Sequence, residues 1–310
     1  MVRFIGRRIV SGLVTIWFIA TATFAAMHAV PGDPLLNDKV VSPAIRANLA
    51  RQYGLDQPLY RQYVLYLGNM LRGDFGISFT QKNRRVNDII REHFPVSAIL
   101  GVVALVFAVA GALLWGGITA RYHNRLPDWI IMFLVILGIS VPGFVFAAWG
   151  QLLLIRINQW FGSTIFPVAG WGTPQHVVVP ALVLGLGTMA YLTRLLRSSM
   201  LETRGADFLR TARAKGLSDS RIFLRHHLRN AILPMVTVLG PAVATITTGG
   251  FVVELVFAIP GLGRYFVQAV QQLDYTVIMG TTVFYGAFLV AMVIAVDILY
   301  GWVDPRIRPG

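Results

Sequence analysis

The chain has 310 residues and no cysteine, and 55% of its residues are hydrophobic while 13% are charged. A soluble domain carries about 25% charged residues, and the 27 Lys and Arg residues here outnumber 14 Asp and Glu. This composition excludes a disordered chain, a disulfide scaffold and a cysteine-ligated metal site. Because the charges are clustered between long apolar stretches, the sequence indicates an integral membrane protein rather than a nucleic-acid-binding protein.

The apolar stretches predict six membrane-spanning helices, since a helix of about 20 apolar residues crosses the hydrocarbon core. The first stretch is too long for the core of a signal peptide, which favours a retained helix over a cleaved leader. Hydrocarbon cannot satisfy free backbone groups, so the fold class is all-α. The predicted spans cover residues 9–30, 96–120, 129–155, 177–196, 232–257 and 277–303.

An extracytoplasmic segment, residues 31–95, is predicted to separate the first two spans and to be partly helical. Ser42-Pro43 suits the start of a helix. A second apolar stripe begins at Leu59 and continues through Tyr63, with Gly73 as its predicted stop. We interpret the segment as an amphipathic cap on the membrane or the bundle; a docking surface for an external partner is the alternative.

Breaks and small residues characterise the core transmembrane region, residues 96–303. Pro142 and Gly143 interrupt the third predicted span and permit a bend, which suits a mobile pathway but also static packing. Small residues four positions apart predict close approach of helix backbones in lipid; they are Ala104, Ala108 and Ala112 in one span, and Gly240, Ala244 and Thr248 in another.

Two acidic residues fall at membrane depth, where a carboxylate needs a partner or a watery cavity. Glu254 lies near the outer end of the fifth predicted span, and exposure at the interface is an alternative to a pathway role. Asp297 lies near the inner end of the sixth. For Asp297 we favour a structural pair with a basic residue over a part in transport.

Basic residues in the loops predict the orientation, because Lys and Arg accumulate on the cytoplasmic side. Placing both termini in the cytoplasm, including the tail at 304–310, leaves only Arg156 and Arg264 in the two short outer loops. The predicted cytoplasmic groups are Arg3, Arg7, Arg8, Arg121, Arg125, nine Lys and Arg residues from Arg194 to Arg229, Arg306 and Arg308.

Catalytic motifs are missing from the sequence. A phosphate-binding loop needs Gly-Lys followed by Ser or Thr, but Lys39, Lys82 and Lys215 follow Asp, Gln and Ala. The sequence also lacks the His-Glu-x-x-His pattern of zinc proteases. We therefore expect neither ATPase nor other catalytic activity, and no bound metal, in this chain.

The segment 197–231, between the fourth and fifth spans, is predicted to be a cytoplasmic loop. The small residues Ala212 and Ala214 precede Gly216, and Ser218 is a natural cap for a helix that continues to about Asn230. Such a projecting helix suits a groove on another protein. An ordinary basic loop explains the same residues equally well.

The motifs of this segment, "RTARAKGL" at Arg210–Leu217 and "RNAILP" at Arg229–Pro234, resemble those of ABC-importer permeases of the dipeptide/oligopeptide family. The general family motif begins Glu-Ala-Ala, where this chain has Arg210-Thr211-Ala212, as the peptide branch does. Further resemblances occur in the same order: "PGDP" at Pro31–Pro34, "YGLDQPLYRQY" at Tyr53–Tyr63, "GDFGIS" at Gly73–Ser78, "PGLGR" at Pro260–Arg264 and "DPRIR" at Asp304–Arg308.

The resemblance implies a multi-pass permease subunit of the bacterial cytoplasmic membrane with the type I importer bundle, of the kind that comes first in the permease heterodimer. It also implies a second, similar permease, two ATP-binding subunits that hold ATP and Mg²⁺, and an extracytoplasmic solute-binding protein. This chain would itself hold no cofactor. The residues implied in coupling to the ATPases are Ala212, Lys215, Gly216, Leu217, Ser218 and Asp219.

The resemblance implies peptides as the cargo. Permeases with similar motifs also serve nickel chelates, glutathione and some sugars, which remain alternatives. An ion-coupled secondary transporter is a less favoured reading, because the chain shows neither internal repeats nor a mid-membrane ionic site.

Overall fold

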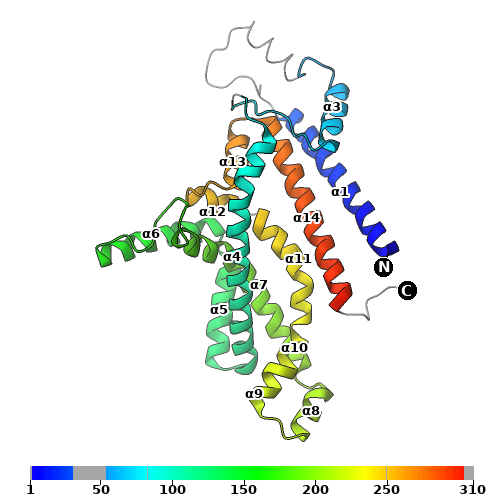
Figure 1. The fold of residues 1–310 in the computed structure, drawn as a ribbon. Helices are drawn as coiled ribbons and strands as arrows, with labels where there is room; N and C mark the ends of the chain where they lie inside the picture. The colour runs from blue at the N-terminus through cyan, green and yellow to red at the C-terminus, as the bar shows by residue number, and fades with distance from the viewer. Residues whose placement is uncertain (1, 31–53, 82, 249, 304–310) are drawn as a thin grey trace. The chain divides into compact units, whose positions relative to one another are not determined.

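The fold is known from a computed structural model, which describes residues 2–30, 54–81, 83–248 and 250–303 (Figure 1). These residues form helices and one isolated antiparallel bridge between Ile77 and Arg85, which confirms the all-α prediction. The longer helices are α1 (Val2–Ala29), α3 (Leu59–Leu71), α4 (Val86–Arg121), α5 (Leu126–Ser140), α6 (Gly143–Phe161), α7 (Gln175–Thr203), α8 (Asp207–Ala214), α11 (Leu233–Thr248), α13 (Leu262–Gln271) and α14 (Tyr275–Val303). Shorter ones are α9 (Asp219–Arg221), the π-helical turn η1 (Ile222–His227), α10 (Leu228–Ala231) and α12 (Phe251–Val256).

The chain divides into two compact units. Unit 1 comprises Met1–Ser97 and Pro260–Ala291, and unit 2 comprises Ala98–Ile259 and Met292–Gly310. Because α4 and α14 each cross a boundary, the two units share these helices.

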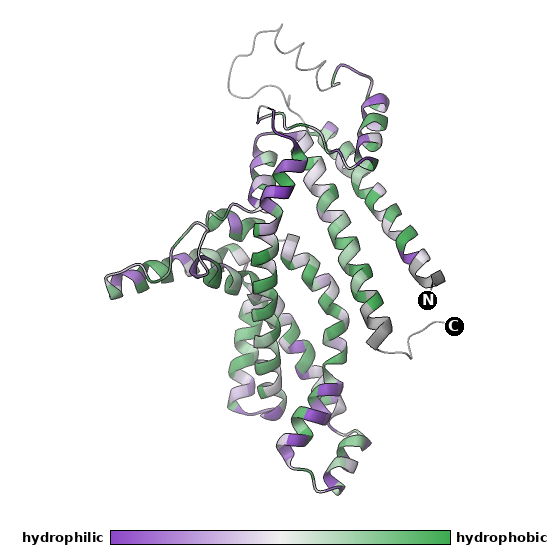
Figure 2. Ribbon diagram, in the orientation of Figure 1, coloured by the Kyte–Doolittle hydropathy of each residue, from purple (hydrophilic) through white to green (hydrophobic). Residues whose placement is uncertain are grey.

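Five segments are long and apolar enough to cross a membrane, and the bent pair α5–α6 makes a sixth if it is one span. Figure 2 shows their mainly hydrophobic composition, with hydrophilic residues gathered at α8–α10. The sequence therefore located the spans, although α4 begins ten residues before the predicted start at 96. The five segments are Gly6–Ala29, Val86–Arg121, Gln175–Thr203, Leu233–Val256 and Tyr275–Val296.

The third predicted span, 129–155, is not one straight helix. It is divided into α5 and α6, whose axes differ by 110°. Val141, at the break, has extended backbone angles (φ −84°, ψ 127°), as expected for the residue before proline, because the proline ring disfavours the helical conformation there. Pro142 also has no N–H group to continue the helical hydrogen bonds.

The core of unit 2 depends on small residues between helices. Ala104, Ala108 and Ala112 of α4 are almost completely buried. A Cβ atom added to Gly185 of α7 would lie only 2.6 Å from the backbone oxygen of Ala104. The predicted close approach of helices is confirmed, and at Gly185 only glycine permits it.

The core of unit 1 packs the start of α4 against α13 and α14, through Val86, Ile89, Leu262 and Ile278. The sequence prediction did not contain α13. This helix carries polar residues along one side, so it does not appear as an uninterrupted apolar stretch.

Asp274 anchors a loop of unit 1 to the start of α14. Its buried carboxylate accepts hydrogen bonds from the backbone N–H of Val277 (3.2 Å), as an N-cap does, and from the N–H of Phe79 (3.1 Å). Thr80 adds its hydroxyl at 2.9 Å, and Ser78 of the "GDFGIS" motif donates to the same carboxylate. The carboxylate therefore joins two segments almost 200 positions apart.

The described part of the segment 31–95 confirms its second predicted helix as α3. Gly73 follows it with φ +73° and donates its N–H to Met70, as expected of a helix stop. Tyr63 of α3 packs against α1: its hydroxyl is 2.7 Å from Thr21 Oγ1, and the centre of its ring is 5.3 Å from that of Phe24. The predicted start at Ser42-Pro43 lies outside the described residues.

Candidate functional site: the coupling segment and the cavity at the helix break

The segment expected to couple this chain to an ATPase is a compact helical hairpin at one end of unit 2 (Figure 1). Leu209 and Ala212, on one face of α8, are buried against Ile222 of η1, with Leu217 packed beside them. The small side chain of Ala212 lets the two arms come together. The hairpin therefore has a small apolar core of its own.

The turn of this hairpin is a Schellman motif, which ends a helix with a left-handed residue. Gly216 has φ +72°, and its N–H donates to the backbone oxygen of Arg213 at 2.9 Å. The N–H of Leu217 donates to the oxygen of Ala212 at 3.3 Å, and its side chain joins the hairpin core. The predicted turn at Gly216 is confirmed.

The second arm begins after Ser218, as predicted, and continues through α9, η1 and α10 to Ala231, close to the predicted end. Two details differ from the prediction. The side chain of Ser218 makes no capping hydrogen bond, and the middle of the arm is π-helical rather than α-helical.

The candidate coupling residues differ in their exposure to solvent. Lys215, Gly216, Ser218 and Asp219 are exposed at the tip of the hairpin, whereas Ala212 is buried and Leu217 is half-buried. The exposed group can contact another protein. Ala212 and Leu217 can contribute only by shaping the turn.

The second arm is joined firmly to α7. His227 donates a hydrogen bond from Nε2 to the backbone oxygen of Met200 (2.7 Å), and the same nitrogen lies 3.1 Å from Thr203 Oγ1. Phe223 and Leu228 pack on a cluster that includes Leu196 and Met200 of α7. The second arm and α7 are therefore connected by packed side chains as well as by hydrogen bonds.

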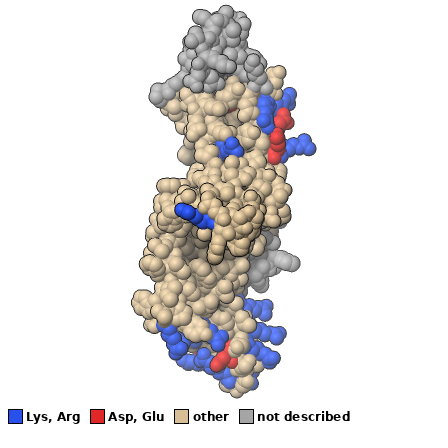
Figure 3. All heavy atoms as spheres, turned by 90° about the vertical axis from the view of Figure 1, so that its left-hand side faces the viewer, with Lys and Arg blue, Asp and Glu red and all other residues tan. Residues whose placement is uncertain are grey.

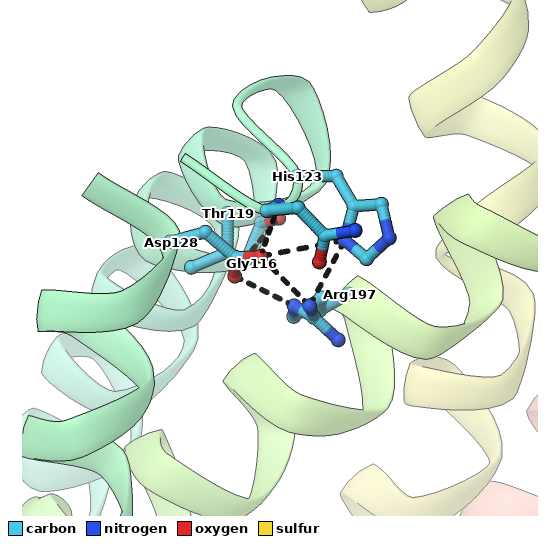
Figure 4. Close-up of polar contacts among 6 residues, drawn as sticks. Gly116, Thr119, His123, Asp128 and Arg197 are labelled. Carbon is cyan, nitrogen blue, oxygen red and sulfur yellow. Dashed lines mark hydrogen bonds and ion pairs between the residues drawn. The ribbon is translucent and has the colours of Figure 1, made fainter. Parts of the chain in front are cut away.

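An ion pair between buried Asp128 and half-buried Arg197 joins α5 to α7 (Figure 4). Arg197 donates from Nε to one oxygen of Asp128 and from Nη2 to the other, each at 2.8 Å. The backbone N–H of Asn124 also donates to Asp128 (2.9 Å), and His123 Nδ1 lies 3.0 Å from Arg197 Nη2. The sequence reasoning missed this pair. One signal for the pair was available in the sequence: an acidic residue stands at the start of one predicted span, and a basic residue stands near the end of the next.

A cavity of about 550 Å³ lies at the break between α5 and α6. Pro142 and Gly143 line it, opposite Tyr191 and Arg194 of α7 and Val253 of α12. Its volume falls in the range of roughly 300–1,000 Å³ that is usual for small-ligand pockets. Its described walls are apolar except for Tyr191 and Arg194, so a ligand would meet one cation and one hydroxyl.

The structure tests the prediction for one of the two intramembrane acids, Glu254, but not that for Asp297. Glu254 is only 1% exposed within α12, so the alternative of exposure at the interface is wrong for the isolated chain. Asp297 lies in α14, but its side chain is outside the described part of the structure, and its predicted structural pair stays a prediction.

Unit 1 contains a separate cavity of about 530 Å³ beside α3, lined in part by His28, Gln62, Tyr66 and Asp74. The hydroxyl of Tyr66 is buried and has no hydrogen-bond partner among the described residues. Burial, with a smaller contribution from nearby Tyr63, raises the pKa of Tyr66 above its ordinary value. The hydroxyl is therefore a neutral, unused donor at the cavity.

Within the described part of the chain, no three His, Asp or Glu side chains gather in a way that could hold a metal ion. The expectation that this chain binds no cofactor stays a prediction.

Known proteins resemble the chain over its whole length. The family described as "Binding-protein-dependent transport system inner membrane component" matches residues 112–309, and the model for the N-terminal part of such components matches residues 1–101. The dipeptide transport system permease protein DppB of Bacillus subtilis is 45% identical over 309 residues, which are 99% of this chain and 98% of that protein. The oligopeptide transport system permease protein OppB of Escherichia coli K12 is 36% identical over 310 residues, covering 99% of this chain and all of that protein.

The fold also resembles a solved structure. A chain of the inward-facing MetNI methionine ABC transporter superposes with a TM-score of 0.54 at 15% identity, covering 71% of this chain and 97% of that one. At this identity the likeness concerns the fold alone.

Proposed function

The chain belongs to the family of binding-protein-dependent transport system inner membrane components, and from this membership we propose that it is the permease subunit of an ATP-driven peptide importer. The observation that carries the proposal is similarity along the whole chain to permeases named for dipeptides and oligopeptides. The chain forms half of the translocation pathway in the bacterial cytoplasmic membrane and performs no catalysis itself.

The partners in this proposal are a second permease, two ATP-binding subunits and an external solute-binding protein. The exposed tip of the hairpin, from Lys215 to Asp219, contacts one ATPase. Because η1 and α10 are packed on α7, closure of the ATPases upon ATP binding moves α7. The pathway then alternates between the two sides of the membrane.

The cavity at the helix break is a section of this pathway. Its polar groups, Arg194 and Tyr191, suit the carboxylate and the amide groups of a short peptide. Since the native chain has no cysteine, Tyr191→Cys allows selective labelling in the complete complex. Peptide and ATP together should slow labelling there but leave Leu152→Cys, on the exposed face of α6, unaffected. Equal labelling rates with and without cargo at both positions would remove the cavity from the pathway.

Uptake into liposomes tests the proposed function. The complete complex with its binding protein should accumulate a labelled dipeptide or oligopeptide only when ATP is hydrolysed. Nickel chelates, glutathione and sugars serve as competing cargoes. Failure to take up any peptide, together with ATP-driven uptake of one of these solutes, would reject the peptide assignment but keep the permease assignment.

A further inference from the structure

Three arginines meet at a cavity of unit 2 for which the proposed transport of peptides supplies no ligand. The cavity has a volume of about 260 Å³ and lies where α4, α7 and the hairpin meet. Arg121 is the last residue of α4, Arg204 follows α7 directly, and Arg213 is in the last turn of α8. The three guanidinium groups therefore come from three separate helix ends.

The charge at this cavity is not balanced locally. Asp219 is the single acidic residue in the described lining, against the three arginines. None of the three is within ion-pair distance of a carboxylate among the residues that the structure describes. Figure 3 shows Lys and Arg gathered at this end of unit 2. The cavity is thus a concave, cationic part of an already basic surface.

The floor of the cavity is apolar and holds one arginine in place. Ala120, Leu209, Ile222 and Phe223 provide the floor. The guanidinium carbon of Arg121 lies 5.9 Å from the centre of the Phe223 ring, a cation–π contact. An occupant therefore meets cationic groups at the rim and hydrocarbon below.

The position of the cavity identifies the occupant. The segments Val86–Arg121 and Gln175–Thr203 are both candidate membrane spans, and both end at this cavity. Headgroup phosphates lie at the depth where spanning helices end, and basic pockets between such helices bind anionic lipid headgroups. At about 260 Å³ the cavity is smaller than the roughly 300–1,000 Å³ of pockets for whole ligands, which fits a headgroup whose acyl chains stay in the bilayer.

We propose that Arg121, Arg204 and Arg213 form a binding site for the phosphate headgroup of an anionic phospholipid. The bound lipid links the ends of α4 and α7 to α8, and so holds the hairpin at a fixed angle to the membrane. The proposal does not depend on the identity of the transported cargo.

The test uses the complete complex in nanodiscs with equal amounts of phosphatidylglycerol and phosphatidylcholine, and counts retained lipids by native mass spectrometry. The variant Arg121→Gln/Arg204→Gln/Arg213→Gln should lose retained phosphatidylglycerol. The expected loss is roughly fivefold for each arginine removed, since a hydrogen bond from one guanidinium to the bound phosphate contributes about 1 kcal/mol. Arg204→Gln alone, at an exposed position, provides a milder variant with an expected loss of roughly fivefold.

The matched control is Arg221→Gln/Arg225→Gln/Arg229→Gln, which removes the same charge from exposed positions of the second arm outside the cavity. It should retain phosphatidylglycerol at nearly the wild-type level. Equal losses in both triple variants would reveal a diffuse basic surface, and no loss in Arg204→Gln or the cavity variant would show an empty cavity; either overturns the proposal. Release of the lipid by millimolar inorganic phosphate would also overturn it, because the site would then take free phosphate.

Discussion

Gly216 is the residue on which the geometry of the hairpin 207–231 depends. At φ +72° a residue with a Cβ atom costs about 1–2 kcal/mol, while a Cβ at this position would touch no other atom within 4 Å. We expect Gly216→Ala to lower the ratio of native to non-native turn by roughly five- to thirtyfold, and to lower ATP-driven uptake without reducing the amount of assembled complex. Uptake and ATP hydrolysis measured together in liposomes check this expectation.

Two variants separate backbone conformation from side-chain size at this turn. Gly216→Asn should retain most of the uptake, because asparagine adopts the left-handed conformation more readily than alanine. Gly205→Ala, at an equally uncrowded glycine without a positive φ, should behave as wild type. If Gly216→Ala transports normally, the turn geometry has no role in coupling.

A second prediction for single residues concerns the ion pair of Asp128 and Arg197. Removing Arg197 leaves the buried carboxylate of Asp128 alone, which costs about 3–5 kcal/mol, whereas removing Asp128 leaves the half-buried guanidinium of Arg197 and costs less. We expect Asp128→Asn or Arg197→Gln to lower the thermal stability of the purified complex strongly, and the double variant to lose less than the sum of the two. Glu202→Gln, an exposed acid near the end of α7, is the control. Additive losses would show that the two side chains do not interact.

Single residues were predictable from the sequence when their role is local. The left-handed turn at Gly216 and the helix stop at Gly73 follow from the conformational freedom of glycine. The Asp128–Arg197 pair and the carboxylate of Asp274 were missed because their partners depend on which helices pack together. A charge pattern along one chain does not contain that information.

Among the elements, the loop 77–80 and helix α14 depend on each other through Asp274. The carboxylate caps α14 and accepts hydrogen bonds from the loop, so its removal leaves several buried donors unsatisfied. We predict that Asp274→Ala destabilises the complex by about 2–4 kcal/mol and increases proteolysis of the loop. Differential scanning fluorimetry and limited proteolysis measure the two effects.

Thr276→Val is the intermediate case, since it removes one hydroxyl, which lies 2.7 Å from the backbone oxygen of Ile77 and 2.9 Å from the carboxylate of Asp274, and it should show a smaller loss. Asp56→Ala, at an exposed acid outside the network, should show none. A loss for Asp56→Ala as large as that for Asp274→Ala would mean that the effect comes from net charge and not from the network.

The elements show where sequence patterns are sufficient and where they fail. Uninterrupted apolar stretches located the spanning helices because hydrocarbon excludes charge. Pro142-Gly143 indicated a bend, but its angle of 110° could not be predicted from these two residues, since α6 packs on α7 and α12, which lie elsewhere in the sequence. The amphipathic helix α13 was missed because it is short and polar on one side, and a charge count cannot distinguish it from a loop.

For the whole molecule, the charge pattern predicts both termini in the cytoplasm and residue 57 outside. The native chain has no cysteine, so single cysteines report the side directly. Gln57→Cys should react with a membrane-impermeant maleimide in intact cells, whereas Arg3→Cys and Arg306→Cys should react only after permeabilisation. Reaction of position 57 only from the cytoplasmic side would reverse the topology.

The most direct test of the central claim, that this chain is a permease driven by partner ATPases, compares two liposome preparations. In the first, the purified chain alone is given a proton or sodium gradient and a labelled dipeptide; we expect no uptake and no ATP hydrolysis. In the second, the complete complex is supplied with its binding protein on one side of the membrane and with ATP on the side where the ATPases lie. We expect uptake that stops when ATP is replaced by a non-hydrolysable analogue. Gradient-driven uptake by the chain alone, abolished by Asp297→Asn, would contradict the account and identify a secondary transporter.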